Sequence, residues 1–139
     1  MNTYAFEQLE KGMTESFTVT ITEEMMSSFK SITGDINPLH NSAEFAVAGG
    51  YKDRVVYGML SSSFLSTLAG VYLPGKNSLV HSVEVNFARP VYVGDVLNVS
   101  GKIIELSDTV VNRITLKVVI MNQEGEKVLR GKMIVGVMK

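Results

Sequence analysis

Hydrophobic and polar residues alternate along five stretches of the chain, and this pattern predicts five β-strands. Alternation with a period of two is typical of a strand that buries one face. The first stretch precedes all the helical patterns, and the other four fill the second half of the chain. A glycine-containing turn, NQEGE, predicts a hairpin between the last two strands. The predicted strands are residues 15–21, 78–87, 96–105, 110–121 and 128–137.

Helical spacing of apolar residues marks three segments between the first and second strands. Thr22 is positioned to cap the first helix, and two acidic residues follow it in the first turn, where the helix dipole favours anions. Gly34 ends that helix, and Pro38 prevents the next residues from continuing it. Ser42 is predicted to cap the N-terminus of a second, short helix, which ends at a Gly-Gly pair. The third and longest helix is predicted over residues 58–73.

The long helix of residues 58–73 has few charges and many small residues. Such a helix is one that other elements pack closely around. A strand, then helices, then consecutive antiparallel strands predict an α+β layer fold in which the sheet wraps the long helix. The chain shows no repeat, linker or low-complexity segment. At 139 residues it is expected to form one domain over residues 1–139.

Composition narrows the class of protein. Hydrophobic residues make up 45% and charged residues 19%, which is typical of an ordered globular chain. The absence of cysteine excludes disulfides, thiolate zinc sites and cysteine nucleophiles. No apolar run approaches the roughly 20 residues needed to cross a bilayer, and the N-terminal residues do not resemble a signal peptide. We expect a soluble, cytoplasmic protein without a membrane partner.

Charge gives no sign of a nucleic-acid partner, since the net charge is −1. Its distribution is uneven: residues 1–48 hold two lysines against seven acidic residues, and residues 49–139 hold eleven basic against seven acidic residues. An anionic ligand, a self-complementary interface or chance scatter on a solvated surface would each account for this division.

Asp35 and His40 share one seven-residue loop, GDINPLH. A proline-broken turn can direct both side chains into one cleft, where a carboxylate and an imidazole can hold one water as a general acid/base pair. By spacing alone, ordinary turn and surface roles remain open. His81 falls on the apolar side of its strand and is interpreted as structural. Ser61, Ser62 and Ser63 do not form a nucleophile elbow and are interpreted as packing residues, with Ser62 or Ser63 candidates to line a site. No cluster has the spacing of a metal site.

Three blocks of sequence carry a family resemblance. The segment SITGDINPLH, residues 31–40, resembles the hydratase signature of the MaoC-like dehydratases, which include the R-specific enoyl-CoA hydratases. VVYGML at 55–60 resembles the segment that opens the central helix of that family, and VNFARPVYVGD at 85–95 resembles its strand and turn. The blocks occur in family order and span about half of the chain.

The resemblance implies a hot-dog fold, an antiparallel sheet curled around one long helix. It implies that Asp35 and His40 are the catalytic pair, and that the backbone N–H of Gly58 is the oxyanion donor. The implied reaction adds water to C3 of a trans-2-enoyl thioester and a proton to C2, or reverses this from the R-3-hydroxyacyl thioester. No cofactor is implied beyond the coenzyme A or acyl carrier protein thioester that serves as substrate. The family also implies a homodimer or higher homo-oligomer with active sites near the subunit interface.

Asn37, Tyr57, Met59 and Ser62 are predicted to lie on the substrate side of the site. For Asn37 we favour a bracing role in an Asx-type turn. Tyr57 departs from the family pattern, which commonly has histidine before the helix-opening glycine, and this puts its local role and the acyl preference in question. Two roles are open for the basic residues Arg89, Lys52 and Arg54. They would either contact the phosphates of coenzyme A or be solvated surface side chains.

Two other functions remain open from the sequence. One is thioester hydrolysis on the same fold, and the other is a non-catalytic acyl-binding subunit. Acyl length, carrier and pathway also remain open, with fatty acid metabolism, polyester precursor supply and specialised metabolism all compatible with such a domain.

Overall fold

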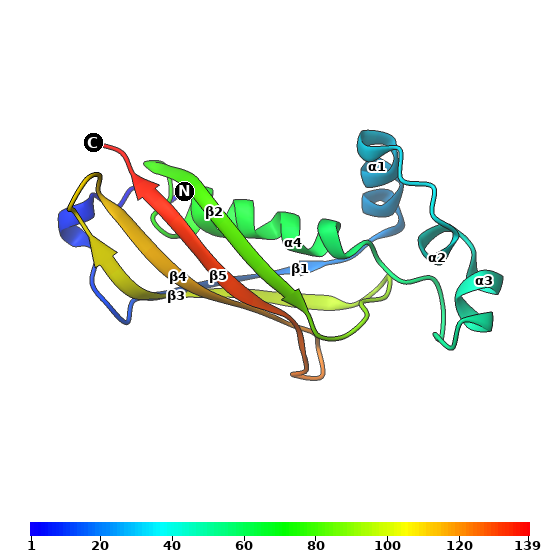
Figure 1. The fold of residues 1–139 in the computed structure, drawn as a ribbon. Helices are drawn as coiled ribbons and strands as arrows, with labels where there is room; N and C mark the ends of the chain where they lie inside the picture. The colour runs from blue at the N-terminus through cyan, green and yellow to red at the C-terminus, as the bar shows by residue number, and fades with distance from the viewer.

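The computed structural model describes residues 1–139, and its main element is one five-stranded antiparallel sheet (Figure 1). The spatial order of the strands is β1-β3-β4-β5-β2, so the two edges are formed by β1 and β2. All five predicted strands are confirmed, and the β4–β5 hairpin turns at the predicted glycine. The strands are β1 (Thr14–Thr20), β2 (Ser78–Phe87), β3 (Val96–Ser107), β4 (Arg113–Met121) and β5 (Lys127–Val137).

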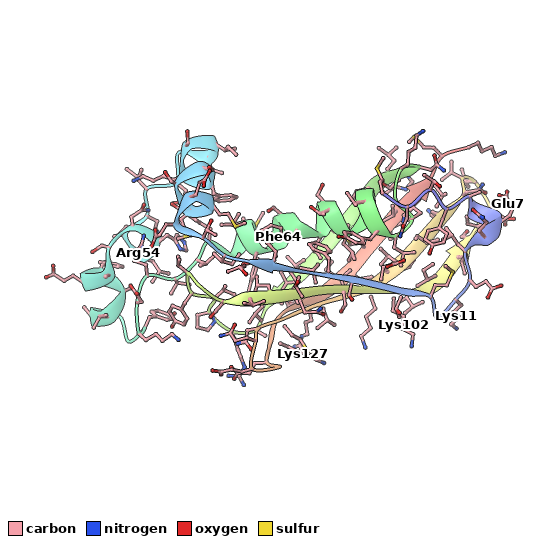
Figure 2. All side chains as sticks on the ribbon, turned by 180° about the vertical axis from the view of Figure 1, so that it is seen from behind. Glu7, Lys11, Arg54, Phe64, Lys102 and Lys127 are labelled. Carbon is pink, nitrogen blue, oxygen red and sulfur yellow. The ribbon has the colours of Figure 1, made fainter.

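The curled sheet packs around helix α4 (Gly58–Thr67), which continues as a five-residue π-helical segment, Leu68–Tyr72 (Figure 1). This confirms the predicted central helix and the α+β class. The alternation in β4 points four side chains inward, each with 0% exposure: Ile114, Leu116, Val118 and Ile120. They belong to one core cluster of 23 buried residues, to which α4 contributes Leu60 and Leu65. Figure 2 shows Phe64 on α4, partly buried against this core.

Three helices project from the end of the sheet that lies opposite the two chain termini (Figure 1). They are α1 (Glu23–Thr33), α2 (Pro38–Asn41) and α3 (Ala43–Ala48), and a 3-10 turn, Phe6–Gln8, precedes β1. The predicted caps are confirmed, because Thr22 accepts from the Met25 N–H and Ser42 from the Phe45 N–H. The short helix α2 lies where only a broken turn was expected, since Pro38 starts a helix as readily as it ends one. None of the helices has the length and apolar character that crossing a membrane requires.

Strand β2 departs from the predicted alternation. A register shift between Val80 and Ser82 makes His81 the extra residue of a β-bulge, which reverses the side-chain alternation on either side of it. The interpretation of His81 as a satisfied or partly buried structural histidine is therefore wrong about its burial, because the residue is exposed. The residues opposite the inward positions of β5 are instead Val80, Val83, Val85 and Phe87.

Gly131 on β5 lets the backbone of β2 approach closely, and this contact is testable. A Cβ added there would lie 2.0 Å from the backbone oxygen of Glu84. Because backbone cannot swing aside, we expect Gly131→Ala to lower the free energy of unfolding by about 1–3 kcal/mol in urea denaturation. Gly70→Ala is the matched control, since its Cβ would meet only the Ser78 Oγ, at 3.8 Å, and should cost little. Equal effects of the two changes would contradict the close approach.

Candidate active site

The loop between α1 and α2 is fixed by its own short polar side chains. The Thr33 Oγ1 accepts from the Asp35 N–H at 3.2 Å, and the Asp35 Oδ1 accepts from the Asn37 N–H at 3.0 Å. The Asn37 Oδ1 then accepts from the Leu39 N–H at 2.9 Å and caps α2. This chain of side-chain-to-backbone bonds sets the loop without regular structure. In it Asn37 has the bracing geometry expected for it.

Tyr57 joins this loop and the end of α2 to the start of α4. Its hydroxyl donates to the backbone oxygen of Asp35 at 2.6 Å and accepts from Asn41 Nδ2 at 3.2 Å. Its ring lies 4.3 Å from the His40 ring, centroid to centroid, and 4.8 Å from that of Phe29. Only 2% of Tyr57 is exposed, so these contacts form in the interior. The residue thus positions the backbone of Asp35 and the imidazole of His40 together.

The orientation of the His40 ring follows from one hydrogen bond. Its Nδ1 lies 2.6 Å from the backbone oxygen of Val55. A carbonyl oxygen only accepts, so Nδ1 carries the hydrogen. In the neutral ring Nε2 then holds a free lone pair, which no group of the chain engages. His40 is half-buried, and its Nε2 makes no hydrogen bond with the chain.

A cavity of about 310 Å³ opens beside His40 and the first turn of α4. The N–H groups of the first helical residues, Gly58 and Met59, have no partner within the helix, and the positive end of the helix dipole lies there. The ring of Phe87 packs over Gly58, where an added Cβ would lie 2.9 Å from it. The cavity is mostly apolar and is lined by His40, Tyr51, Val55, Val56, Gly58, Ser61, Phe87, Ala88, Arg89, Pro90, Val91, Val128 and Leu129.

The structure brings only some of the predicted site residues to this cavity. His40 and Gly58 line it, whereas Asp35, Asn37, Tyr57, Met59 and Ser62 do not. Asp35 is half-buried near the start of the braced loop, whereas His40 follows the loop, in α2. Met59 is 64% exposed, and the Ser62 hydroxyl donates to the Met59 backbone oxygen at 3.0 Å. No three His, Cys, Asp or Glu side chains lie close enough together to hold a metal ion.

Sequence reasoning missed Ser61 as a residue of the cavity. It lines the cavity, is 2% exposed, and its hydroxyl has no hydrogen-bond partner. The signal that would have identified it is its spacing. Ser61 follows Gly58 by three residues, and residues three apart share a helix face.

The three basic residues considered as contacts for coenzyme A phosphates lie in different surroundings. Lys52 lies over the Tyr92 ring, with its Nζ 4.4 Å from the centroid. Arg54 pairs with Glu23 of α1, and Figure 2 places it among the projecting helices. Arg89 lines the cavity and lies 3.3 Å from the Glu126 carboxylate. A hydrogen bond from Asn122, and then the Arg89 charge, lower the pKa of Glu126.

Comparison with known proteins gives consistent matches. The family model described as "MaoC like domain" matches residues 6–126. A 3-hydroxybutyryl-CoA dehydratase of Methylorubrum extorquens is 36% identical over 101 residues, which cover 73% of this chain and 64% of the relative. An (R)-specific enoyl-CoA hydratase of Rhodospirillum rubrum is 33% identical, over 65% of this chain and 62% of the relative. The matched region is thus less than two thirds of each of these relatives.

Solved structures match over more of their length. An unliganded R-hydratase from Pseudomonas aeruginosa superposes with a TM-score of 0.89 at 30% identity, covering 97% of this chain and 86% of that one. An (R)-hydratase from A. caviae, described as involved in PHA biosynthesis, gives 0.89 at 29% identity, over 94% and 98% of the two chains. These matches confirm the hot-dog fold.

Removing the Tyr57 hydroxyl tests its role in bracing the loop. We expect Tyr57→Phe to lower the free energy of unfolding by about 1–2 kcal/mol, because the Asp35 carbonyl loses its donor in a buried setting. Urea denaturation measures this. Tyr92→Phe is the control, since that change keeps the ring under Lys52 and removes no intramolecular hydrogen bond of the hydroxyl. An unchanged stability of Tyr57→Phe would contradict the bracing role.

Proposed function

The chain belongs to the MaoC-like domain family, and we propose that it hydrates trans-2-enoyl thioesters to R-3-hydroxyacyl thioesters and catalyses the reverse dehydration. The observation that carries this proposal is one juxtaposition. His40, whose Nε2 makes no hydrogen bond with the chain, and the N-terminus of α4 both line the same mostly apolar cavity. The names of the relatives, hydratases and dehydratases of acyl-CoA, support the same chemistry.

In the proposed reaction Asp35 and His40 hold one water; Asp35 enters this assignment from the sequence motif, because its side chain does not line the cavity. The Nε2 of His40 accepts a proton as the water oxygen forms a bond to C3 of the enoyl thioester. The electrons of the C2=C3 bond move toward the thioester carbonyl, whose oxygen gains negative charge. The N–H of Gly58 and the positive end of the α4 dipole stabilise that oxygen. The enolate then collapses as C2 takes a proton from the pair, so one water is added overall.

The step is redox-neutral and uses only water, a base and an acid, so we propose that no cofactor takes part. Apolar side chains surround the reacting groups, with Val56 and Val91 at 2% and 5% exposure and Leu129 at 0%. Such lining excludes bulk water and strengthens the interaction of the helix terminus with the developing charge. The apolar lining is also suited to contact the hydrocarbon chain of an acyl thioester.

Substituting the catalytic pair tests the proposal. Asp35→Asn and His40→Gln should each reduce hydration of crotonyl-CoA by about 10²–10⁴-fold, because each removes a proton-transfer group while nearly keeping its shape. Loss of ultraviolet absorbance of the conjugated double bond measures the rate. The melting temperature should stay close to that of the unsubstituted protein.

The matched control is Asp108→Asn, an exposed carboxylate between β3 and β4, which should leave the rate unchanged. Full activity of Asp35→Asn would contradict its assignment. Release of free thiol from crotonyl-CoA without hydration would contradict the reaction itself and favour thioester hydrolysis.

We also propose that the chain forms a homodimer through β2. Both β1 and β2 are sheet edges, but their side chains differ. The outward positions of β1 are polar. On the helix-facing side of β2, Val80, Val83 and Phe87 are 40%, 48% and 52% exposed, although the Phe87 ring contacts Gly58 at the start of α4. An uncovered apolar row on an open edge is a surface that a second copy would bury. This surface includes Phe87 of the cavity, which would place the site beside the interface.

A charge placed in this row tests the interface. Val83→Lys should convert the dimer to monomer in light scattering coupled to size-exclusion chromatography, since a lysine would be buried without a partner. Thr18→Lys, at an exposed position of the β1 edge, should leave the dimer intact. A Val83→Lys protein that remains fully dimeric would contradict the assignment of β2.

A further inference from the structure

Ser61 differs from its two neighbours in how its hydroxyl is satisfied. The hydroxyls of Ser62 and Ser63 donate to the backbone oxygens one turn back, Met59 at 3.0 Å and Leu60 at 2.6 Å. The Ser61 hydroxyl makes no such bond, although the residue is 2% exposed. Burying a hydroxyl without a partner costs free energy, and such groups are rare in folded proteins. A partner from outside the chain would remove this cost.

The position of Ser61 indicates where that partner lies. Ser61 and Gly58 both line the cavity, one helical turn apart on the same face of α4. Side chains on a helix tilt toward its N-terminus, so the Ser61 hydroxyl is carried toward the first turn. An acceptor atom at that turn would then be shared by the Gly58 N–H and the Ser61 O–H.

We infer that the Ser61 hydroxyl donates a hydrogen bond to the carbonyl oxygen of the thioester, as a second donor beside the Gly58 N–H. This assignment rests on the proposed hydration reaction. When water adds to C3, the electrons of the C2=C3 bond pass to that carbonyl oxygen, and they return when C2 takes a proton. The hydroxyl therefore binds more strongly to the enolate than to the ground-state thioester, which is the condition for accelerating the step.

The surroundings strengthen this donor. Val56 and Leu129, which also line the cavity, are 2% and 0% exposed, so the hydroxyl acts away from bulk water. In such a setting a neutral donor stabilises developing charge far more than it would in solvent. A purely structural serine would instead serve only as a small side chain, and alanine would replace it without loss.

Kinetics of two substitutions separate these roles. Ser61→Ala should lower kcat for crotonyl-CoA by about 100-fold, with KM changed only a few-fold, while the melting temperature stays equal or rises. Ser61→Thr keeps the hydroxyl and should retain most of kcat. Ser63→Ala is the matched control on the same helix, and it should leave kcat unchanged.

Binding without turnover tests the same bond directly. The probes are butyryl-CoA and its thioether analogue butyl-CoA, which lacks the carbonyl oxygen. The unsubstituted protein should prefer butyryl-CoA by calorimetry, and Ser61→Ala should lose about tenfold of that preference, as expected for one hydrogen bond of about 1.4 kcal/mol.

The outcomes are distinguishable. If the unsubstituted protein hydrates enoyl thioesters and Ser61→Ala keeps kcat within twofold, the assignment of Ser61 is overturned and the proposed function stands. Equal losses in Ser61→Ala and Ser63→Ala, with a lower melting temperature, would assign the effect to helix packing and also overturn it. A protein that hydrates no enoyl thioester would overturn both.

Discussion

Tyr57 occupies a buried position at the N-terminus of α4, and its hydroxyl joins the helix to the loop that precedes α2. Through this one residue the backbone of Asp35 is held at 2.6 Å and the ring of His40 is packed at 4.3 Å. A tyrosine suits this position because its ring fills the core while its hydroxyl satisfies two polar partners. Tyr57, the residue that departs from the family pattern, therefore holds the backbone of Asp35 and the ring of His40 in place without lining the cavity.

The rest of the site depends on where α4 begins. A helix start leaves its first N–H groups without partners, and here they lie beside a cavity lined mostly by apolar side chains. Gly58 fits this position because the ring of Phe87 occupies the space that a side chain would need. Two helices and the sheet thus converge on one place: α4 supplies N–H donors, α2 supplies His40, and the end of β2 supplies part of the apolar wall. Hydration of an activated double bond needs this combination of a base and a preorganised donor for the carbonyl oxygen.

Much of the fold was predictable because it depends on local pattern. Alternation identified the strands, since one face of each central strand is buried, and the lack of charge in residues 58–73 identified the central helix. The caps at Thr22 and Ser42 were equally readable, because each depends only on residues within the next turn. The motif of residues 31–40 indicated His40, and the block of residues 55–60 indicated Gly58; both line the cavity.

Features that depend on contacts between distant segments could not be predicted from the sequence. The bulge at His81 arises from pairing with β5, and alternation within β2 alone gives no sign of it. The bracing role of Tyr57 needs a loop 22 residues away in sequence. Ser61 differs from Ser62 and Ser63 only in what surrounds its hydroxyl, which the run of three serines does not show.

The most direct test of the proposed chemistry is the fate of solvent hydrogen during hydration. With crotonyl-CoA in D₂O, the first-formed product should carry one deuterium at C2 and the R configuration at C3, as observed by NMR. A product of S configuration, or one without deuterium at C2, would contradict the account of water and a proton delivered within this cavity.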